Sequence, residues 1–380
     1  MQSAAITGFA ELPASRGGDG VTALDLYCRL AREIAADAEL ERGEIDGLLI
    51  HTPFDGFSLY WPTVLGDALA LELRYFDVVE LGGASAAGMV WRAAAAIEAG
   101  LCDHVLCLTA DVFTGLGGVR DLMPAQRSEY EMPYGASPPT GYYAMAAQRH
   151  MHDYGTRPEQ LAKIAVDQRT NAMATPGALF GSKPLTIDDV LGSPMVCEPL
   201  HLFEIVSPCT GGAGVVVSRR SASKSKHPPI ALIGAGEAGT HLNLARRPDI
   251  TTSLAVRSAE TAFRMAGLGA ADMDFAQLYD CYTIAVMIFL EDLGFCAKGE
   301  GGRFVAERDL TWCGDFPLNT SGGQLSYGQP GGAGGMIAVV EAVRQLMGRA
   351  GSRQIKSAAK GVAQGNGGVF ADEVTLVMAN

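Results

Sequence analysis

The sequence predicts a duplicated α/β fold, and three observations lead to that prediction. Two stretches of the chain repeat one order of strands and helices, each stretch contains a glycine-rich turn that opens a helix, and a polar segment separates them. The chain has 380 residues, of which 48% are hydrophobic and 19% charged. That length suits two similar domains, and that composition can bury a large core.

Each copy of the repeat begins with a strand and a helix. Residues 4–12 (AAITGFAEL) resemble residues 230–238 (IALIGAGEA), because both are apolar strands that run into glycine and glutamate. The next elements are amphipathic helices at about 21–38 and 251–266, then acidic starts leading into buried strands at 44–54 and 272–283. In this alignment His51 of the first copy corresponds to Tyr279 of the second.

The second part of each copy is a glycine-rich turn, a helix and a pair of strands. The turns and helices are GGASAAGMVWRAAAAIEAG (82–100) and QPGGAGGMIAVVEAVRQLMG (329–348). The strand pairs are 104–112 with 213–218 in the first copy and 360–368 with 373–379 in the second. The predicted order is therefore strand, helix, strand, helix, strand, strand, repeated twice.

The remaining segments set the domain boundaries. SRRSASKSKHPP (218–229) is polar, basic and ends in two prolines, as a linker does. The first copy is interrupted by an insertion, with helices predicted at about 141–154 and 158–174. An insertion of this size at a strand end usually covers a site, although a surface excursion is the other interpretation. The predicted domains are an N-terminal half at 1–112 and 196–220, the insertion at 113–195, a linker at 221–229 and a C-terminal half at 230–380.

Charge, hydropathy and cysteine spacing exclude several classes of protein. The formal net charge of −13 leaves no basic face for nucleic acid. No segment approaches the roughly 18 apolar residues of a membrane span, and the N-terminus lacks the features of a signal peptide. Eight scattered cysteines show no metal-ligand spacing. We therefore expect a cytoplasmic protein with reduced thiols and no metal site of its own.

These features together resemble the thiolase superfamily, in particular the sterol-carrier-protein-type thiolases and their thiolase-like relatives. The resemblance covers nearly the whole chain, because the N-terminal strand, the long insertion and NTSGGQLSYGQPGGAGG (319–335) fall where that family places its parts. It implies five layers, α-β-α-β-α, and a dimer formed through the N-terminal half.

The catalytic positions of that family are altered in this chain. A thiolase carries its nucleophilic cysteine at the start of the first buried helix, and counting back from the helix end AIEAG places Gly83 there. The family's Gly-His-Pro turn reads Gly-Gln-Pro at 328–330, and Gln329 is no general base. The late cysteine should fall around 362–366, where none occurs. Thiolysis by the usual covalent route is therefore excluded, and we interpret Ser85 as a helix-cap or packing residue.

Two tyrosines take the place of the missing groups. The sterol-carrier-type motif His-Asp-Cys-Phe reads Tyr-Asp-Cys-Tyr at 279–282, and Tyr327 stands two residues before Gln329. A buried tyrosine is usually structural, but two at catalytic positions favour a function. The resemblance assigns Tyr279 and Tyr327 as a converging proton-transfer pair. The other expected site-lining or orienting residues are Asp280, Cys281, Gln329, Gly83 and Asn319.

Two phenols without a nucleophile suit the retro-aldol cleavage of a β-hydroxyacyl-CoA. That reaction needs one group at the hydroxyl, a proton donor at carbon and hydrogen bonds to the thioester oxygen. Because tyrosine ordinarily titrates near pH ~10, a tyrosine base needs a lowered pKa or a proton relay. The residues leave open which tyrosine meets the hydroxyl.

The YDCYT and SYGQPGGAGG patterns are most similar to steroid side-chain aldolases of actinobacteria and proteobacteria. That resemblance implies cleavage of a 17-hydroxy steroid C20-carboxyl-CoA to a 17-ketosteroid and propionyl-CoA. It also implies a heterotetramer, in which a homodimer of this chain binds a small zinc-ribbon and OB-fold partner. No cofactor would be tightly bound in this chain: CoA belongs to the substrate, and zinc to the partner. The Tyr/Pro-rich segment 127–143 is either a partner contact or packing within the insertion.

Two other interpretations stay open from the sequence. One is a different carbon–carbon lyase or acyltransferase on CoA thioesters. The other is a catalytically inactive CoA- or sterol-binding subunit that stabilises a partner enzyme. The sequence does not identify the acyl group, and it does not locate the residues that bind CoA.

Overall fold

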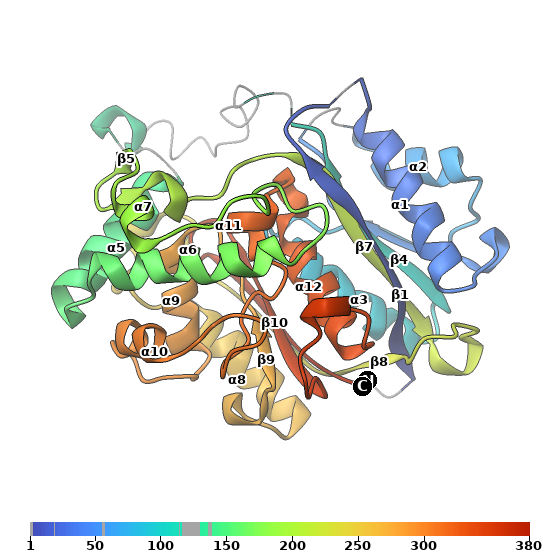
Figure 1. Ribbon diagram of the computed structural model, residues 1–380. Coiled ribbons are helices and arrows are strands. Elements are labelled where there is room, and N and C mark those ends of the chain that lie inside the picture. The colour runs from blue at the N-terminus through green and yellow to red at the C-terminus, as the bar shows by residue number, and fades with distance from the viewer. Residues whose placement is uncertain (1–2, 19, 55–57, 114, 116–129, 136–138) are drawn as a thin grey trace.

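The computed structural model describes residues 3–18, 20–54, 58–113, 115, 130–135 and 139–380. Within these residues the two copies of the repeat form half-sheets that are joined edge to edge (Figure 1). The described strands make one nine-stranded sheet of order β3-β2-β4-β7-β1-β8-β11-β10-β9. The two half-sheets meet where β1 pairs with β8 in antiparallel fashion through two residue pairs, Ala5 with Ala231 and Ile6 with Ile230.

The elements follow the predicted order in both halves. The first half contains β1 (Ala4–Ser15), α1 (Ala23–Asp37), β2 (Gly47–Ile50), α2 (Trp61–Leu69), β3 (Tyr75–Val78), α3 (Ser85–Glu98), β4 (His104–Asp111) and β7 (Thr210–Arg219). The second half contains β8 (Ile230–Gly239), α8 (Ala255–Ala266), β9 (Phe275–Gln277), α9 (Thr283–Asp292), α10 (Gly301–Glu307), α11 (Gly323–Tyr327), α12 (Gly334–Leu346), β10 (Lys360–Gly367) and β11 (Asp372–Ala379). The repeat is therefore confirmed, with α2 and β3 as elements the sequence did not separate.

Strand register confirms the alignment between the copies. β2 runs parallel to β4 and β9 runs parallel to β10, and the two pairings begin at Gly47 and Phe275. His51 and Tyr279 each follow four residues later, so they occupy equivalent positions just beyond the carboxyl ends of equivalent strands. Ligands of open α/β sheets bind at such strand ends.

The hydrophobic core divides into layers because strand side chains alternate between faces. In β4, Val105 and Cys107 face a central core that also contains α3 and α12, whereas Leu106 and Leu108 face an outer core with α1 and α2. A further outer core packs α8, α9 and α5 against the second half-sheet. The order is helices, half-sheet, α3 with α12, half-sheet, helices, which confirms the expected five layers (Figure 1).

The insertion forms a helical unit on one side of the molecule (Figure 1). Its described helices are α5 (Thr140–Tyr154), α6 (Pro158–Met173) and α7 (Ile187–Leu191), followed by the hairpin β5 (Met195–Cys197) and β6 (Leu200–His201). The two helices that the sequence predicted there are confirmed. Residues 116–129 and 136–138, which include part of the Tyr/Pro-rich segment, lie outside the described residues. Within the part of the chain that is described, no helix is long and apolar enough to cross a membrane.

Candidate active site

The start of α3 is in direct contact with Tyr279. Gly83 lies in the tight turn before that helix, and a Cβ added to Gly83 would lie only 2.2 Å from the Tyr279 ring and 2.3 Å from its hydroxyl oxygen. The ring therefore occupies the space that a side chain at position 83 needs. Tyr279 is 6% exposed. A phenol thus stands where the resemblance expects a thiol.

Gln329 is held in place and contacts the same phenol. Its Nε2 donates to the Tyr279 hydroxyl at 3.2 Å. The Gln329 N–H donates to the Ser207 carbonyl at 3.0 Å, and its carbonyl accepts from the Cys209 N–H at 2.9 Å. The segment that returns from the insertion therefore fixes this glutamine beside Tyr279.

Asp280 organises the helix that carries Tyr327. Its buried carboxylate accepts the N–H groups of Gln324 at 2.9 Å and Leu325 at 3.1 Å, which open α11. Burial raises the Asp280 pKa to about 6, although these two bonds oppose the shift. Asp280 therefore orients α11 through its first turn, and α11 ends at Tyr327.

Asn319 fixes the backbone before Tyr279. Its Oδ1 accepts the Leu278 N–H at 2.7 Å and its Nδ2 donates to the Leu278 carbonyl at 2.9 Å, so the amide holds both main-chain groups of Leu278. Asn319 has a φ of 46°, a left-handed conformation that asparagine tolerates better than most residues. The Nδ2 of Asn171, from α6 of the insertion, donates to the Asn319 carbonyl at 3.2 Å. The insertion therefore supports this side of the site.

A second layer of polar groups lies behind Tyr279. The Tyr279 N–H donates to Gln364 Oε1 at 3.2 Å. Tyr143, from α5, accepts from Asn366 Nδ2 at 2.8 Å and stacks on Tyr282 with ring centroids 4.2 Å apart. These four residues were not identified from the sequence as site residues, because their partners lie 85 or more residues away and leave no local pattern.

Cys281 lies in the same buried layer. Burial raises the pKa of its thiol well above the ordinary value, and the neighbouring Tyr143 hydroxyl opposes that shift. A neutral thiol is a weak nucleophile and packs as a small apolar group. Cys281 is therefore placed beside the site and does not replace the missing nucleophile.

Tyr327 is directed differently from Tyr279. It is 3% exposed, and its hydroxyl donates to the Leu12 carbonyl of β1 at 3.4 Å. No hydrogen bond joins the two phenols among the described residues. Burial raises the pKa of both tyrosines, and Glu11 raises that of Tyr327 further. The structure therefore brings Gly83, Tyr279 and Gln329 together and places the Tyr327 hydroxyl against β1.

Ser85 has the packing role that the sequence predicted. It is fully buried, and its Oγ accepts the Leu81 N–H at 2.8 Å, which closes the turn before α3.

No group of three or more metal-ligating side chains occurs within the described ranges.

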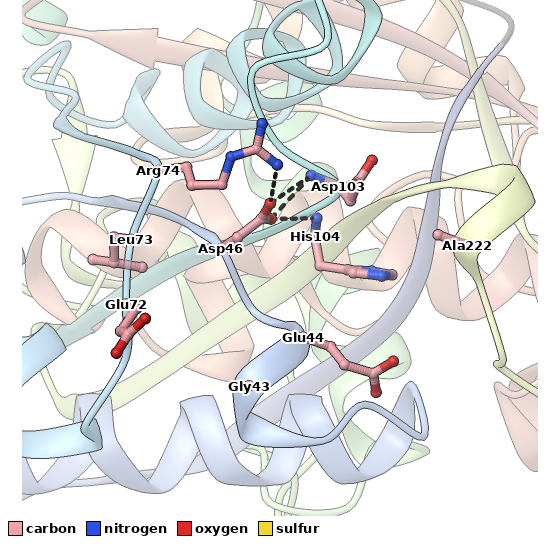
Figure 2. Close-up of a pocket in the computed structure, with 9 residues that line it drawn as sticks. All are labelled: Gly43, Glu44, Asp46, Glu72, Leu73, Arg74, Asp103, His104 and Ala222. Carbon is pink, nitrogen blue, oxygen red and sulfur yellow. Dashed lines mark hydrogen bonds and ion pairs between the residues drawn. The ribbon is translucent and has the colours of Figure 1, made fainter.

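A separate hollow of about 720 Å³ lies at the other end of the first half-sheet (Figure 2). There Asp46 accepts the N–H groups of Asp103 and His104 and forms an ion pair with Arg74 at 3.3 Å. Asp46, Asp103 and Arg74 directly precede β2, β4 and β3, so the hollow is at the amino ends of the parallel strands. Such sheets bind ligands at the opposite end. None of the predicted site residues lines it.

A duplicated five-layer fold whose nucleophile position is filled by a phenol defines a thiolase-like enzyme without the covalent route. Comparison with known proteins agrees. Residues 236–380 match the thiolase C-terminal domain-like family. A steroid side-chain-cleaving aldolase of Thermomonospora curvata is 34% identical, with 90% of each chain covered. A 17-hydroxy-3-oxo-4-pregnene-20-carboxyl-CoA lyase of Mycobacterium tuberculosis is 30% identical, over 91% of this chain and 92% of that one.

Two further comparisons complete the assignment. An acetyl-CoA acetyltransferase of Methanothermobacter thermautotrophicus is 33% identical, over 87% of this chain and 88% of that one. The solved Ltp2-ChsH2(DUF35) aldolase has a TM-score of 0.90 and 31% identity, covering 99% of this chain and 97% of that one. The chain belongs to the thiolase superfamily, in its sterol-carrier-protein-type, thiolase-like branch. Within that branch it is grouped with the aldolases, as a carbon–carbon lyase and not a conventional thiolase.

Proposed function

We propose that this enzyme cleaves a β-hydroxyacyl-CoA thioester by a retro-aldol reaction. One observation carries the proposal: the Tyr279 phenol fills the side-chain space of Gly83 and is hydrogen-bonded by Gln329. An acyl-enzyme cannot form at Gly83, whereas a fixed hydroxyl at that place can transfer a proton to or from a bound thioester.

The reaction needs no covalent intermediate. The β-hydroxyl loses its proton and becomes a carbonyl as the Cα–Cβ bond breaks. The electron pair of that bond passes into the thioester as an enolate, and a proton added at Cα completes the second product. The net change moves one proton from oxygen to carbon. Fixed hydrogen-bond donors near the thioester oxygen lower the barrier by stabilising the enolate.

The hydrogen bonds support different roles for the two phenols. Gln329 Nε2 donates to the Tyr279 oxygen, which leaves the Tyr279 proton free for the substrate. Burial keeps that proton in place by raising the pKa, so we assign Tyr279 as the proton donor at Cα. We assign Tyr327 to the β-hydroxyl, because the bond that it donates to the Leu12 carbonyl leaves its oxygen free to accept a hydrogen bond from that group. The proton released from the β-hydroxyl then passes through water to Tyr279 and replaces the one that Tyr279 gives to Cα.

The substrate that best fits the comparisons is a 17-hydroxy steroid C20-carboxyl-CoA, giving a 17-ketosteroid and propionyl-CoA. The names of the Thermomonospora and Mycobacterium relatives support a steroid side chain, and the second names the CoA ester. Under this proposal the chain binds no resident cofactor, because CoA arrives with the substrate.

We also propose a homodimer formed through the N-terminal half that binds a DUF35-type partner with a zinc ribbon and an OB-fold. The solved aldolase structure with a TM-score of 0.90 is named for a DUF35 protein, which supports a partner of that type. Within the described part of segment 127–143, Tyr130 and Tyr134 are exposed while Tyr142 and Tyr143 are buried. The first two tyrosines therefore offer aromatic surface to a partner.

The test is to co-express the chain with its DUF35-type partner and incubate the complex with the steroid-CoA. Ketone and propionyl-CoA are followed by mass spectrometry. We expect cleavage by the wild type and a loss of about 10²- to 10⁴-fold in Tyr279→Phe and Tyr327→Phe, the usual scale of one proton-transfer group. Full activity in both variants would refute the phenol mechanism.

The same experiment separates the other candidates. Cleavage of other β-hydroxyacyl-CoA thioesters but not of the steroid would identify a different lyase, and acyl transfer to free CoA would favour the acetyltransferase relatives. A folded complex that binds CoA and cleaves nothing would be a binding subunit.

A further inference from the structure

An unpaired positive charge is buried in the insertion. Arg169 of α6 is 7% exposed, yet it has no carboxylate partner among the described residues. Its Nε donates to Ser326 Oγ at 3.3 Å and its Nη1 to the Lys183 carbonyl at 3.4 Å, both uncharged oxygens. Burial lowers its pKa, which is the direction expected for a cation without a counter-charge. A buried charge of this kind is costly unless an anion joins it.

Aromatic rings hold this guanidinium, and a second arginine shares one of them. The Arg169 guanidinium lies 5.1 Å from the Phe180 ring centroid and 5.8 Å from that of Phe203. The Arg16 guanidinium lies 5.3 Å from the same Phe180 ring. Lys183, which is exposed, follows three residues after Phe180. Arg16 and Lys183 also have no carboxylate partner within the described ranges.

These cations stand out in an acidic protein. The chain carries a formal net charge of −13, and the similarly buried Arg353 is paired with Glu341. Glu204, which follows Phe203 in the chain, is already hydrogen-bonded to His201. Two arginines without a carboxylate partner among the described residues therefore share one ring, and the exposed Lys183 lies three residues along the chain. We name this candidate anion site the Phe180 site after its central residue.

The Phe180 site is attached to the candidate active site by main-chain hydrogen bonds. The Phe180 N–H donates to the Ser326 carbonyl at 3.1 Å, and the Leu179 N–H donates to the Tyr327 carbonyl at 2.8 Å. Ser326 also accepts from Arg169 through its side chain. An anion bound at Phe180 would thus be held against the helix that carries Tyr327.

We propose that the Phe180 site binds the phosphate groups of the CoA thioester through Arg169, Arg16 and Lys183. The inference rests on the proposed function for its choice of anion, because a CoA thioester brings several phosphate charges at the end of a long flexible arm. Guanidinium groups match phosphate oxygens in geometry and charge. The phosphates would anchor the substrate while the arm carries the thioester to Tyr279.

The experiment compares a substrate that has the phosphates with one that lacks them. The same acyl group is presented as a CoA thioester and as a pantetheine thioester to the wild-type complex and to Arg169→Met and Arg16→Met. We expect KM for the CoA thioester to rise about 10- to 100-fold in the variants, with kcat little changed. KM for the pantetheine thioester should be the same in variants and wild type.

A binding measurement keeps the inference separate from the reaction. Calorimetry with CoA itself, 3′-dephospho-CoA and pantetheine needs no turnover, so it remains decisive if steroid cleavage is not observed. We expect the variants to lose CoA affinity and to bind pantetheine as the wild type does. Arg257, an exposed arginine on α8, is the control, and Arg257→Met should bind CoA normally.

Three outcomes would overturn the proposal. The first is wild-type CoA affinity in Arg169→Met and Arg16→Met. The second is an equal loss for CoA and pantetheine. The third is normal CoA binding with loss of the DUF35-type partner on size exclusion, which would make the site a protein contact. Should Arg169→Met fail to fold, the exposed residues Arg16 and Lys183 carry the same test through Arg16→Met and Lys183→Met.

Discussion

The two halves of the molecule build the same contact with different chemistry. The ring of Tyr279, from the second half, lies over Gly83 in the first-half turn before α3. The ring of His51, from the first half, lies over Gly332 in the second-half turn before α12. A Cβ added to either glycine would lie 2.2 Å from the ring that covers it. The duplication therefore preserved the shape of the turn and the position of the ring.

What differs is how the ring is bonded. His51 Nε2 pairs with Glu80 at 3.2 Å, and Asp111 at the end of β4 accepts the Gly332 N–H at 2.7 Å. The corresponding strand in the second half, β10, ends in a glycine, and the Tyr279 hydroxyl has the neutral amide of Gln329 beside it. Carboxylates hold the His51 contact at the second-half turn, whereas the Tyr279 contact at the first-half turn keeps a hydroxyl whose proton is free. The comparison teaches that equivalent geometry becomes a site only where a titratable group is left available.

The largest expected difference comes from adding the same methyl group to both turns. Gly83→Ala and Gly332→Ala meet equally close rings, so we expect both to lose about 1–3 kcal/mol of unfolding free energy through overpacking. Gly83→Ala also displaces Tyr279, and we expect its kcat per folded molecule to fall about 100-fold or more. Gly332→Ala should keep most of its kcat. Denaturant unfolding and turnover assays check both, and equal losses of kcat would remove the distinction between the halves.

The second difference is in the pH dependence of stability near Tyr279. The folded-state pKa of Asp280 is raised from 3.8 to about 6. The folded protein therefore binds the extra proton between these values, and its stability falls as pH rises from about 4 to about 6. We expect Asp280→Asn to lack this decline, which amounts to about 3 kcal/mol at most. Urea unfolding of both proteins at several pH values in that window checks this. The same change of unfolding free energy with pH in both proteins would disprove it.

The smallest effect is expected at His51, the first-half counterpart of Tyr279, with the opposite sign. Burial lowers the pKa of His51 below 6.5, and Glu80 offsets part of that shift. The unfolded chain then takes up the proton first, so stability is complete above pH ~6.5 and decreases as pH falls below it. His51→Gln should lose this acid sensitivity. Thermal unfolding of both proteins, measured at steps of about half a pH unit from about pH 5 to about pH 8, checks this. The same dependence of Tm on pH in His51→Gln and the wild type would contradict the assignment.

The repeat was predictable from sequence because it is a local and periodic property. Apolar strands, glycine-led helices and the correspondence between His51 and Tyr279 all follow from patterns within short windows, and strand register confirms them. The loss of the nucleophile at Gly83 also follows from counting along one helix. These predictions did not depend on how distant segments meet.

The arrangement of the candidate site was less predictable because it depends on distant contacts. The sequence indicated that Tyr279 and Tyr327 converge, but it did not show that the Tyr327 hydroxyl faces the Leu12 carbonyl, 315 residues away in sequence. It also gave no reason to select Gln364 or Tyr143, whose partners come from other elements. The arginines that we propose for CoA binding could not be selected from sequence either, since an unpaired charge is recognised only when its surroundings are known.

The central position of α3 and α12 has a consequence for folding cooperativity. Residues of both helices belong to one core with strands from both half-sheets, while the sheet itself is continuous through only two residue pairs. Either half alone would expose the face of its helix that the other half covers. We therefore expect no independently stable half, and the ancestor of the duplication would have needed a second copy of itself to complete its interior.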